Sequence, residues 1–204
     1  MEPRESHITG VTACLLNWKR PHNMGRIVEH LLNQPFINEI IIHDNSKGVN
    51  IKTYGRYVSA QRASNSTIYV QDDDCIVRDI KSLYEAYNGL QSSKIVTGGT
   101  PGYLEILAKN KYKNRQMAMA GWGMFFEKDW IDFSLYTKMY GKDDCFYREA
   151  DRIFTLLHGG YHTVLDGDIE HLEGYLGLEA MSSQPDHIKY KEKAIERCLR
   201  LVGR

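Results

Sequence analysis

The sequence predicts an α/β fold: a single domain whose central sheet is mostly parallel and is covered by helices on both faces. Strand and helix patterns alternate along the first ninety residues, which is typical of such sheets. Polar clusters follow three of the predicted strands. A length of 204 residues suits one domain with a substantial core and is short for two.

The first half contains three predicted strands and two predicted helices. GVTACLLNW at 10–18 is almost continuously apolar, as in a strand that is buried on both faces. Apolar side chains recur at helical spacing over 21–34. An isoleucine-rich strand is predicted at 37–46 and a β-branched strand at 66–70, and helical spacing resumes over 80–89.

The second half is less regular. Segment 102–116 is ambiguous, and the apolar, glycine-punctuated run at 117–127 fits either a strand or a buried loop. The elements predicted in this half are a strand at 93–99, a helix from Tyr147 to the glycines at 159 and 160, a strand at 162–168 and an amphipathic helix at 188–204.

Composition excludes several classes of protein. The 26 basic and 26 acidic side chains cancel, which argues against a nucleic-acid partner. No apolar stretch is long enough for stable insertion into a membrane, and the acidic N-terminus does not resemble a signal peptide. The four cysteines form no CxxC pair and look like reduced core thiols. We therefore expect a soluble cytoplasmic protein, of a cell or of a virus-infected host.

Three consecutive aspartates, Asp72 to Asp74, follow the strand at 66–70. Polar clusters also follow the two earlier strands, and the carboxyl ends of parallel strands meet at one edge of the sheet, where ligands bind. Crowded carboxylates repel one another unless a cation neutralises them, and Mg²⁺ and Mn²⁺ prefer such oxygens. In an extended segment Asp72 and Asp74 would point the same way. The alternative is a solvated turn or a helix N-cap, with Asp74 capping a helix that starts near Val77.

Four stretches, NWKRP, HDNSKG, TYGRYVSAQR and VQDDDC, carry a family resemblance. With the predicted sheet, they resemble the nucleotide-sugar glycosyltransferases of the Rossmann-like GT-A fold, closest to exostosin-like and small retaining enzymes with a DxD motif. The resemblance implies a UDP-sugar donor, Mn²⁺ or Mg²⁺ as cofactor, and transfer of a sugar to a hydroxyl of a glycan or glycoside acceptor with retention.

The resemblance also implies which residues bind the donor. Asn17 and Arg20 would lie beside the nucleotide, and Asp44 or Asn45 would contact the base or ribose. Arg56 would approach the base or diphosphate, with Arg62 as a competing candidate. Asp72 would contact the ribose, Asp73 would join the nucleotide site, and Asp74 would bind the metal with Asp72.

A later stretch, HLEGYLG, resembles a segment that supplies a histidine to the same metal in several retaining families. His171 fits that role, with His162 and His187 as rivals. Position 177 is Gly where those families have Lys, so the diphosphate contact would come from elsewhere, Lys189 or Lys191 being candidates. A single histidine is otherwise more often a surface or core residue.

Two further sites concern the acceptor. YREADRIF resembles the acidic motif that opens a helix beside the acceptor pocket, which makes Glu149 the first candidate for the catalytic carboxylate and Asp151 the second. Helix capping is the alternative role. Trp122, between two glycines, could form the floor of the acceptor site, although core packing is the commoner role of a tryptophan.

The predicted domain, 1–204, divides into a nucleotide-sugar-binding half at about 8–98, an acceptor-binding half at about 99–185 and a C-terminal helix at 186–204. The stretch 174–185 is predicted to close over the donor as a lid. Two other functions fit the motifs: a metal-dependent phosphohydrolase that uses the aspartate triplet, and a non-catalytic carbohydrate-binding module on the same scaffold.

Overall fold

The computed structural model describes residues 10–89, 95–99, 120–158, 163–175, 177, 180 and 183–203. The ambiguous segment 102–116, the start of the run at 117–127 and His162 lie outside the described residues, as does part of the predicted lid.

A six-stranded sheet forms the centre of the molecule, in the order β2-β1-β3-β6-β5-β7. Its strands are β1 (Val11–Asn17), β2 (Ile37–Asp44), β3 (Thr67–Gln71), β5 (Ile95–Gly99), β6 (Met124–Glu127) and β7 (Thr163–Asp166). The pairs β1·β2, β1·β3 and β5·β7 are parallel, whereas β6 runs antiparallel to both of its neighbours. The mostly parallel sheet that the sequence predicts is therefore confirmed, with one reversed strand in its middle.

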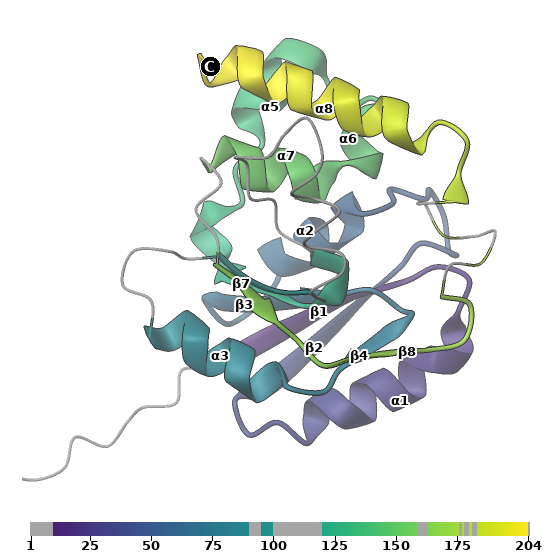
Figure 1. The fold of residues 1–204 in the computed structure, drawn as a ribbon, viewed down its shortest axis with the longest axis vertical. Helices are drawn as coiled ribbons and strands as arrows, with labels where there is room; N and C mark the ends of the chain where they lie inside the picture. Colours follow the sequence, from purple (N-terminus) through teal and green to yellow (C-terminus); the bar gives the residue numbers. More distant parts are fainter. Residues whose placement is uncertain are drawn as a thin grey trace, which may run out of the picture.

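Helices cover both faces of the sheet (Figure 1). The structure describes α1 (Pro21–Leu32), α2 (Tyr54–Gln61), α3 (Ile80–Gly89), α5 (Ser134–Tyr140), α6 (Asp144–Arg148), α7 (Ala150–Leu157) and α8 (His187–Leu201), with single 3₁₀ turns at η1 (Ala120–Trp122) and η2 (Lys128–Trp130). Helices α1 and α3 lie on one side, and α2 lies on the other with α5 to α8 stacked beyond it (Figure 1).

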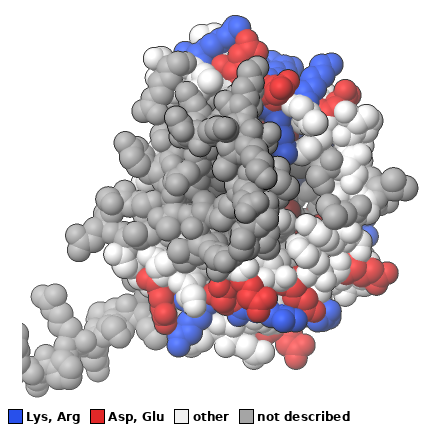
Figure 2. Space-filling model, viewed as in Figure 1, with Lys and Arg blue, Asp and Glu red and all other residues white. Residues whose placement is uncertain are grey.

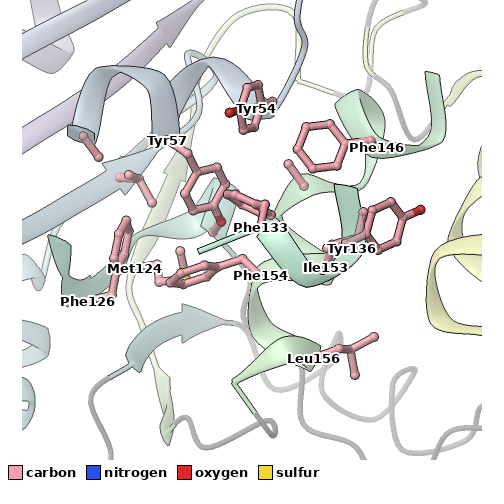
Figure 3. Close-up of a cluster of buried hydrophobic side chains, with 14 of the residues drawn as sticks. Tyr54, Tyr57, Met124, Phe126, Phe133, Tyr136, Phe146, Ile153, Phe154 and Leu156 are labelled. Atoms are coloured by element: carbon pink, nitrogen blue, oxygen red, sulfur yellow. The ribbon is translucent and has the colours of Figure 1, made fainter. Parts of the chain in front are cut away.

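Alternation along the strands divides the buried side chains between two cores. Tyr69 and Phe125 point toward α1 and α3, whereas their neighbours along the strands point toward α2 and α7. The second core is strongly aromatic: Tyr57 lies 5.0 Å from Phe154 between ring centroids and 5.1 Å from Phe133 (Figure 3). Burial on both faces explains why the strands read as continuous apolar runs.

A separate two-stranded ribbon joins distant parts of the chain. Strand β4 (Cys75–Val77) directly follows the aspartate triplet and pairs antiparallel with β8 (Ile169–His171), so that Cys75 lies opposite His171. Because β4 separates the triplet from α3, Asp74 does not cap that helix, and the capping alternative for Asp74 is wrong.

The sequence patterns miss several short elements. The helix predicted from Tyr147 begins instead as α6 at Asp144 and is interrupted at Glu149, which ends α6 and precedes α7. Six of the described elements were not predicted: α2, α5, β4, β8, η1 and η2. All four cysteines are buried and unpaired, as expected of reduced core thiols. Within the described ranges, no helix is long and apolar enough to cross a membrane.

Candidate active site

The carboxyl ends of β1, β2 and β3 bring three predicted donor-site residues, Asn17, Asp44 and Asp72, to one edge of the sheet. Asn17 pairs in register with Asp44, and β3 ends beside β1, where Leu15 pairs with Gln71. Strand β1 lies between β2 and β3, so the chain crosses over in opposite directions on its two sides. Such a position is where ligands bind in open α/β sheets.

Asp73 is the most enclosed member of the triplet. Its Oδ1 accepts a hydrogen bond from Arg20 Nη1 at 2.7 Å, and its Oδ2 accepts one from the Trp18 backbone N–H at 3.0 Å. Both oxygens are thus bound by the loop that follows β1, and the side chain is buried. Asp73 anchors the acidic loop, and its carboxylate faces Arg20 and Trp18 rather than an open site.

Asp72 lies on a buried arginine. Arg56 Nη2 donates to Asp72 Oδ1 at 2.6 Å, while Arg56 Nη1 lies 3.5 Å from Asp151 Oδ2. The Arg56 side chain is 1% exposed and that of Asp72 is 40% exposed. The guanidinium thus links two carboxylates from opposite halves of the chain, and Asp72 keeps its outer side open to solvent.

The third aspartate is held less tightly. Asp74 Oδ2 lies 3.4 Å from Arg20 Nη1, and this nitrogen already donates a hydrogen bond to Asp73 Oδ1. Burial, followed by the nearby charge of Asp72, raises the pKa of Asp74 to about 7. The triplet forms a turn rather than an extended segment, so strict alternation does not apply to it. The charge of Asp72 nevertheless acts on Asp74 more strongly than that of Asp73 does.

Helix α1 fastens the acidic loop to the segment after β8. Asn23 Nδ2 donates to the backbone oxygens of Asp73, at 2.9 Å, and Glu173, at 3.0 Å. Arg20 Nη2 donates to the Gly174 oxygen at 3.0 Å. The backbone N–H of Leu172 donates in turn to the Asp74 oxygen at 2.8 Å. These bonds place the predicted histidine segment beside the triplet.

His171 lies next to this junction in an aromatic group. Its imidazole stacks on Tyr175, with ring centroids 3.5 Å apart, and lies 5.8 Å from the ring of Trp122. Partial burial lowers the pKa of His171, which favours the neutral, ligating form. Trp122 is half-buried, so its ring has both a packed side and an accessible one.

The residues at the end of β2 divide into two roles. Asp44 accepts from Asn17 Nδ2 at 3.1 Å, and the Oδ1 of that asparagine is buried with no hydrogen-bond partner among the described residues. Asn45 instead bonds the backbone of its own loop, donating to Lys52 O and accepting from Ile51 N–H. Asn17 therefore presents an unused acceptor, whereas the side chain of Asn45 holds the loop.

The structure separates the two competing arginines. Arg56 lies in the first turns of α2 and reaches Asp72, as described above. Arg62 is exposed and follows the C-terminal end of the same helix, away from the triplet. Because Arg56 is enclosed by protein, its geometry suits the positioning of Asp72 better than direct contact with a nucleotide.

The two candidate catalytic carboxylates lie at the start of α7. Glu149 is 5% exposed and pairs with Arg152 Nε at 2.9 Å, and burial raises its pKa. It makes no capping hydrogen bond to the helix. Asp151 accepts from Tyr57 Oη at 2.9 Å, and burial raises its pKa to about 6. Asp151 is connected to the aspartate triplet through Arg56. Glu149 lies two residues before Asp151 in the sequence.

The chemistry of the donor set fits a divalent cation. Asp72 and Asp74 supply hard carboxylate oxygens, and Mg²⁺ or Mn²⁺ commonly uses one or two carboxylates and takes its other ligands from substrate phosphates and water. Among the described residues, no group of three His, Cys, Asp or Glu side chains is close enough to enclose a metal by itself. The two aspartates thus match an ion that is shared with a bound diphosphate.

Sequence reasoning missed three residues that shape this site: Asn23, Tyr57 and Gly121. Asp72 N–H donates to Gly121 O at 3.0 Å, and a Cβ at this glycine would overlap the Asp72 carboxylate. A glycine three residues before β6 was the only available signal for Gly121, and it does not indicate which loop that residue approaches. Asn23 and Tyr57 make contacts far along the chain, for which local patterns give no sign.

Around α1 and the β4–β8 ribbon, charged side chains form exposed surface pairs. Figure 2 shows red and blue side chains alternating along the lower part of the face, where α1, β4 and β8 lie. Arg26 and Arg78 both contact Glu170 there, at 2.7 and 3.2 Å. Exposed pairs of this kind stabilise a fold little and suggest no anionic polymer as partner.

Known proteins resemble this chain in structure only. No family model and no curated protein sequence matches it. The glucosyl-3-phosphoglycerate synthase of Mycobacterium tuberculosis, solved with phosphoglyceric acid, has a TM-score of 0.60 at 12% identity, covering 96% of this chain and 80% of its own. A mannosyltransferase from Pyrobaculum calidifontis, solved with GDP-mannose and Mn²⁺, gives 0.61 at 12% identity, covering 91% of this chain and 64% of its own.

The mannosyl-3-phosphoglycerate synthase of Rubrobacter xylanophilus is also similar, with a TM-score of 0.58 at 12% identity over 96% of this chain and 76% of its own. The M. tuberculosis enzyme has additionally been solved with Mn²⁺, UDP and glucosyl-3-phosphoglycerate. These structures are nucleotide-sugar glycosyltransferases, and the likeness shows that this chain has a GT-A-like fold. The narrower resemblance to exostosin-like enzymes stays a prediction.

Proposed function

We propose that this protein is a metal-dependent glycosyltransferase that moves a sugar from a nucleotide diphosphate, UDP by first choice, to an acceptor hydroxyl. The observation that carries the proposal is the acidic loop at the carboxyl end of β3, which buried arginines and backbone bonds hold in place within a GT-A-like fold. The similar enzymes solved with UDP or GDP-mannose together with Mn²⁺ support it.

The donor would lie along the edge formed by β1, β2 and β3. Asn17 Oδ1, a buried acceptor without a described partner, suits a base N–H, and Asp44 beside it suits a base or ribose hydroxyl. Asp72 and Asp74 would hold Mn²⁺, or Mg²⁺, and His171, which stacks on Tyr175, would have to move toward them to become a further ligand. When bound, the ion neutralises charge on the departing diphosphate.

The chain's own residues would orient the reaction. Arg20 and Arg56 fix Asp73 and Asp72, so the carboxylates need little reorganisation when the donor binds. The carboxylates at the start of α7, Asp151 and Glu149, belong to the predicted acceptor-binding half and would position the acceptor hydroxyl or stabilise the sugar as the bond breaks. Trp122 would pack against a sugar ring. Retention of configuration stays our prediction for the outcome.

Thermal shift with a panel of nucleotides tests the proposal. UDP, GDP, CDP and ADP are added with and without Mn²⁺, and one diphosphate is expected to raise the melting temperature only when the metal is present, since a ligand that binds the native state alone stabilises it. Asp74→Asn should abolish this shift. Asp168→Asn, an exposed aspartate on the surface loop before β8, is the matched control and should retain it.

Activity separates the rival functions. A glycosyltransferase should slowly hydrolyse one nucleotide sugar in a Mn²⁺-dependent reaction that Asp74→Asn abolishes. A phosphohydrolase would cleave simple phosphate esters without preference for the nucleotide, and a binding module would bind sugar without turnover. Absence of any nucleotide preference in both assays would overturn the proposal.

A further inference from the structure

Cationic side chains gather where the junction of α6 and α7 meets the first turns of α8. We call Arg148, Arg152, His187 and Lys191 the basic cluster. Helices α7 and α8 pack against each other along this line, at the end of the molecule beyond α2 (Figure 1). Neither the donor site described above nor the aromatic core uses these four side chains.

Each of the two arginines pairs with a carboxylate. Arg148 Nε lies 2.7 Å from Asp144 Oδ2, and its guanidinium lies 4.6 Å from the centre of the Tyr190 ring. Arg152 Nε lies 2.9 Å from Glu149 Oε2, and both of these side chains are largely buried. Asp144 is shared, because Lys52 Nζ also pairs with it.

Lys191 and His187 form no ion pair within the described part of the chain. Burial and the charge of Arg152 lower the pKa of Lys191, whereas the nearby carboxylate of Glu149 acts in the opposite direction. Burial and three neighbouring cations, Lys191 first, lower the pKa of His187 to about 4. Among the described residues around the cluster, the Lys and Arg side chains are Lys52, Arg148, Arg152 and Lys191, and the carboxylates that pair with them are Asp144 and Glu149.

The basic cluster is adjacent to the candidate active site. Glu149 and Arg152 lie on either side of Asp151 in the sequence, within one helical turn, and Asp151 is linked to Asp72 through Arg56. Thr53, three residues before Arg56, donates to the backbone oxygens of Tyr147 and Arg148 at 3.1 Å. A molecule that contacts Glu149 at the start of α7 would therefore lie beside the cluster.

Half-buried cations that repel one another destabilise the protein unless an anion neutralises them. The excess of two positive charges matches a phosphate group, which carries about −1.5 to −2 at neutral pH. Arginine and lysine are the usual donors to phosphate. We propose that the basic cluster binds a phosphate group of the acceptor, so that the acceptor is a phosphorylated hydroxy compound rather than a neutral glycan. This inference rests on the proposed function.

Calorimetric titration with inorganic phosphate tests the site. Wild-type protein is expected to bind phosphate, and Lys191→Gln should weaken the binding at least tenfold. Lys138→Gln is the matched control: it makes the same change at an exposed position of α5, outside the basic cluster and the candidate active site, and should stay within twofold of wild type. The His187 imidazole, followed by NMR, should titrate at higher pH when phosphate is bound, because the anion offsets its cationic neighbours.

A second arm separates an acceptor phosphate from the donor diphosphate. UDP with Mn²⁺ is titrated into wild type, into Lys191→Gln, and into wild type saturated with phosphate. Unchanged UDP binding in all three, together with the loss of phosphate binding in Lys191→Gln, supports an acceptor site. Competition between UDP and phosphate would assign the cluster to the donor and overturn the proposal.

The remaining outcomes are also decisive. Absence of phosphate binding, or equal binding in the two lysine variants, would overturn the site itself. Phosphate binding without any nucleotide binding would remove the proposed function, and with it the assignment of the phosphate to an acceptor, while leaving the anion site in place. If both variants melt within a few degrees of wild type, unfolding is excluded as the cause of weakened phosphate binding.

Discussion

Arg56 holds a full positive charge where almost no water reaches it, between Asp72 and Asp151. Replacement by Met would leave two carboxylates facing each other without a counter-charge, and loss of one partner of a buried pair costs about 3–5 kcal/mol. We expect the free energy of unfolding of Arg56→Met, measured in urea, to fall by that amount. Arg62→Met, an exposed arginine at the end of the same helix, should change it by no more than about 0.5 kcal/mol.

Alanine substitutions at Gly121 and at Gly25 are expected to have contrasting effects on the protein. Alanine at position 121 would place a methyl group on the Asp72 carboxylate, whereas a Cβ at position 25 meets no atom within 4 Å. We expect Gly121→Ala to weaken Mn²⁺-dependent nucleotide binding at least tenfold. Gly25→Ala, inside α1, should leave binding unchanged and stabilise the fold by about 0.5–1 kcal/mol. Equal nucleotide affinities would show that the Asp72 carboxylate need not be fixed.

The grouping of polar side chains at the sheet edge could be predicted where a local pattern marks them. Asp72 to Asp74, Asn17 and Asp44 follow strands, and parallel strands place their ends together whatever the details of packing. Asn23 could not be found in this way, because its partners lie about 50 and 150 residues away. The buried position of Arg56 was also hidden, since a sequence pattern does not show which arginine a helix turns inward.

At the scale of elements, α8 brings a titratable group into a cationic environment. The folded state lowers the pKa of His187 from 6.5 to about 4, so as the pH falls through this window the unfolded chain binds a proton that the folded chain does not. The free energy of unfolding must therefore fall. His187→Asn should reduce this fall, on the order of 1 kcal/mol after allowance for the partial exposure of the ring.

Urea denaturation at several pH values between 7 and 4 measures the effect. Asp74 and Asp151, whose pKa values are raised to about 7 and about 6, act in the opposite direction, because the folded state gains protons before the unfolded chain does. They are present in both proteins, so the difference between wild type and variant isolates the histidine. If the free energy of unfolding falls equally with pH in wild type and in His187→Asn, the lowered pKa of His187 would be contradicted.

The elements with long, regular periods were predictable, and the short ones were not. Strand β1 and helix α1 have clear apolar patterns over seven and twelve residues. Strand β4 has three residues and α6 has five, too few for a period to appear, and their stability comes from tertiary partners. The reversed direction of β6 depends on pairing with β3 and β5, which no local pattern encodes.

At the scale of the whole molecule, burial of all four cysteines predicts that their thiols react slowly in the native protein. Burial raises the pKa of Cys14 and Cys198 to about 12, and Cys75 and Cys145 are shifted in the same direction. A thiol reagent such as Ellman's reagent should find no fast-reacting thiol in the native protein and four in guanidinium chloride. Rapid reaction of any thiol in the native state would show that one of these cores opens readily.

The β4–β8 ribbon has a consequence for the order of assembly. The loop of Asp72 to Asp74 is braced by Leu172, Glu173 and Gly174, about a hundred residues later in the chain. During synthesis the first sheet strands and α1 can pair before those residues leave the ribosome, but the acidic loop cannot reach its final shape. A nascent chain that has formed its early strands would therefore still lack a competent pocket, and ligand capture must await synthesis of β8 and the residues that follow it.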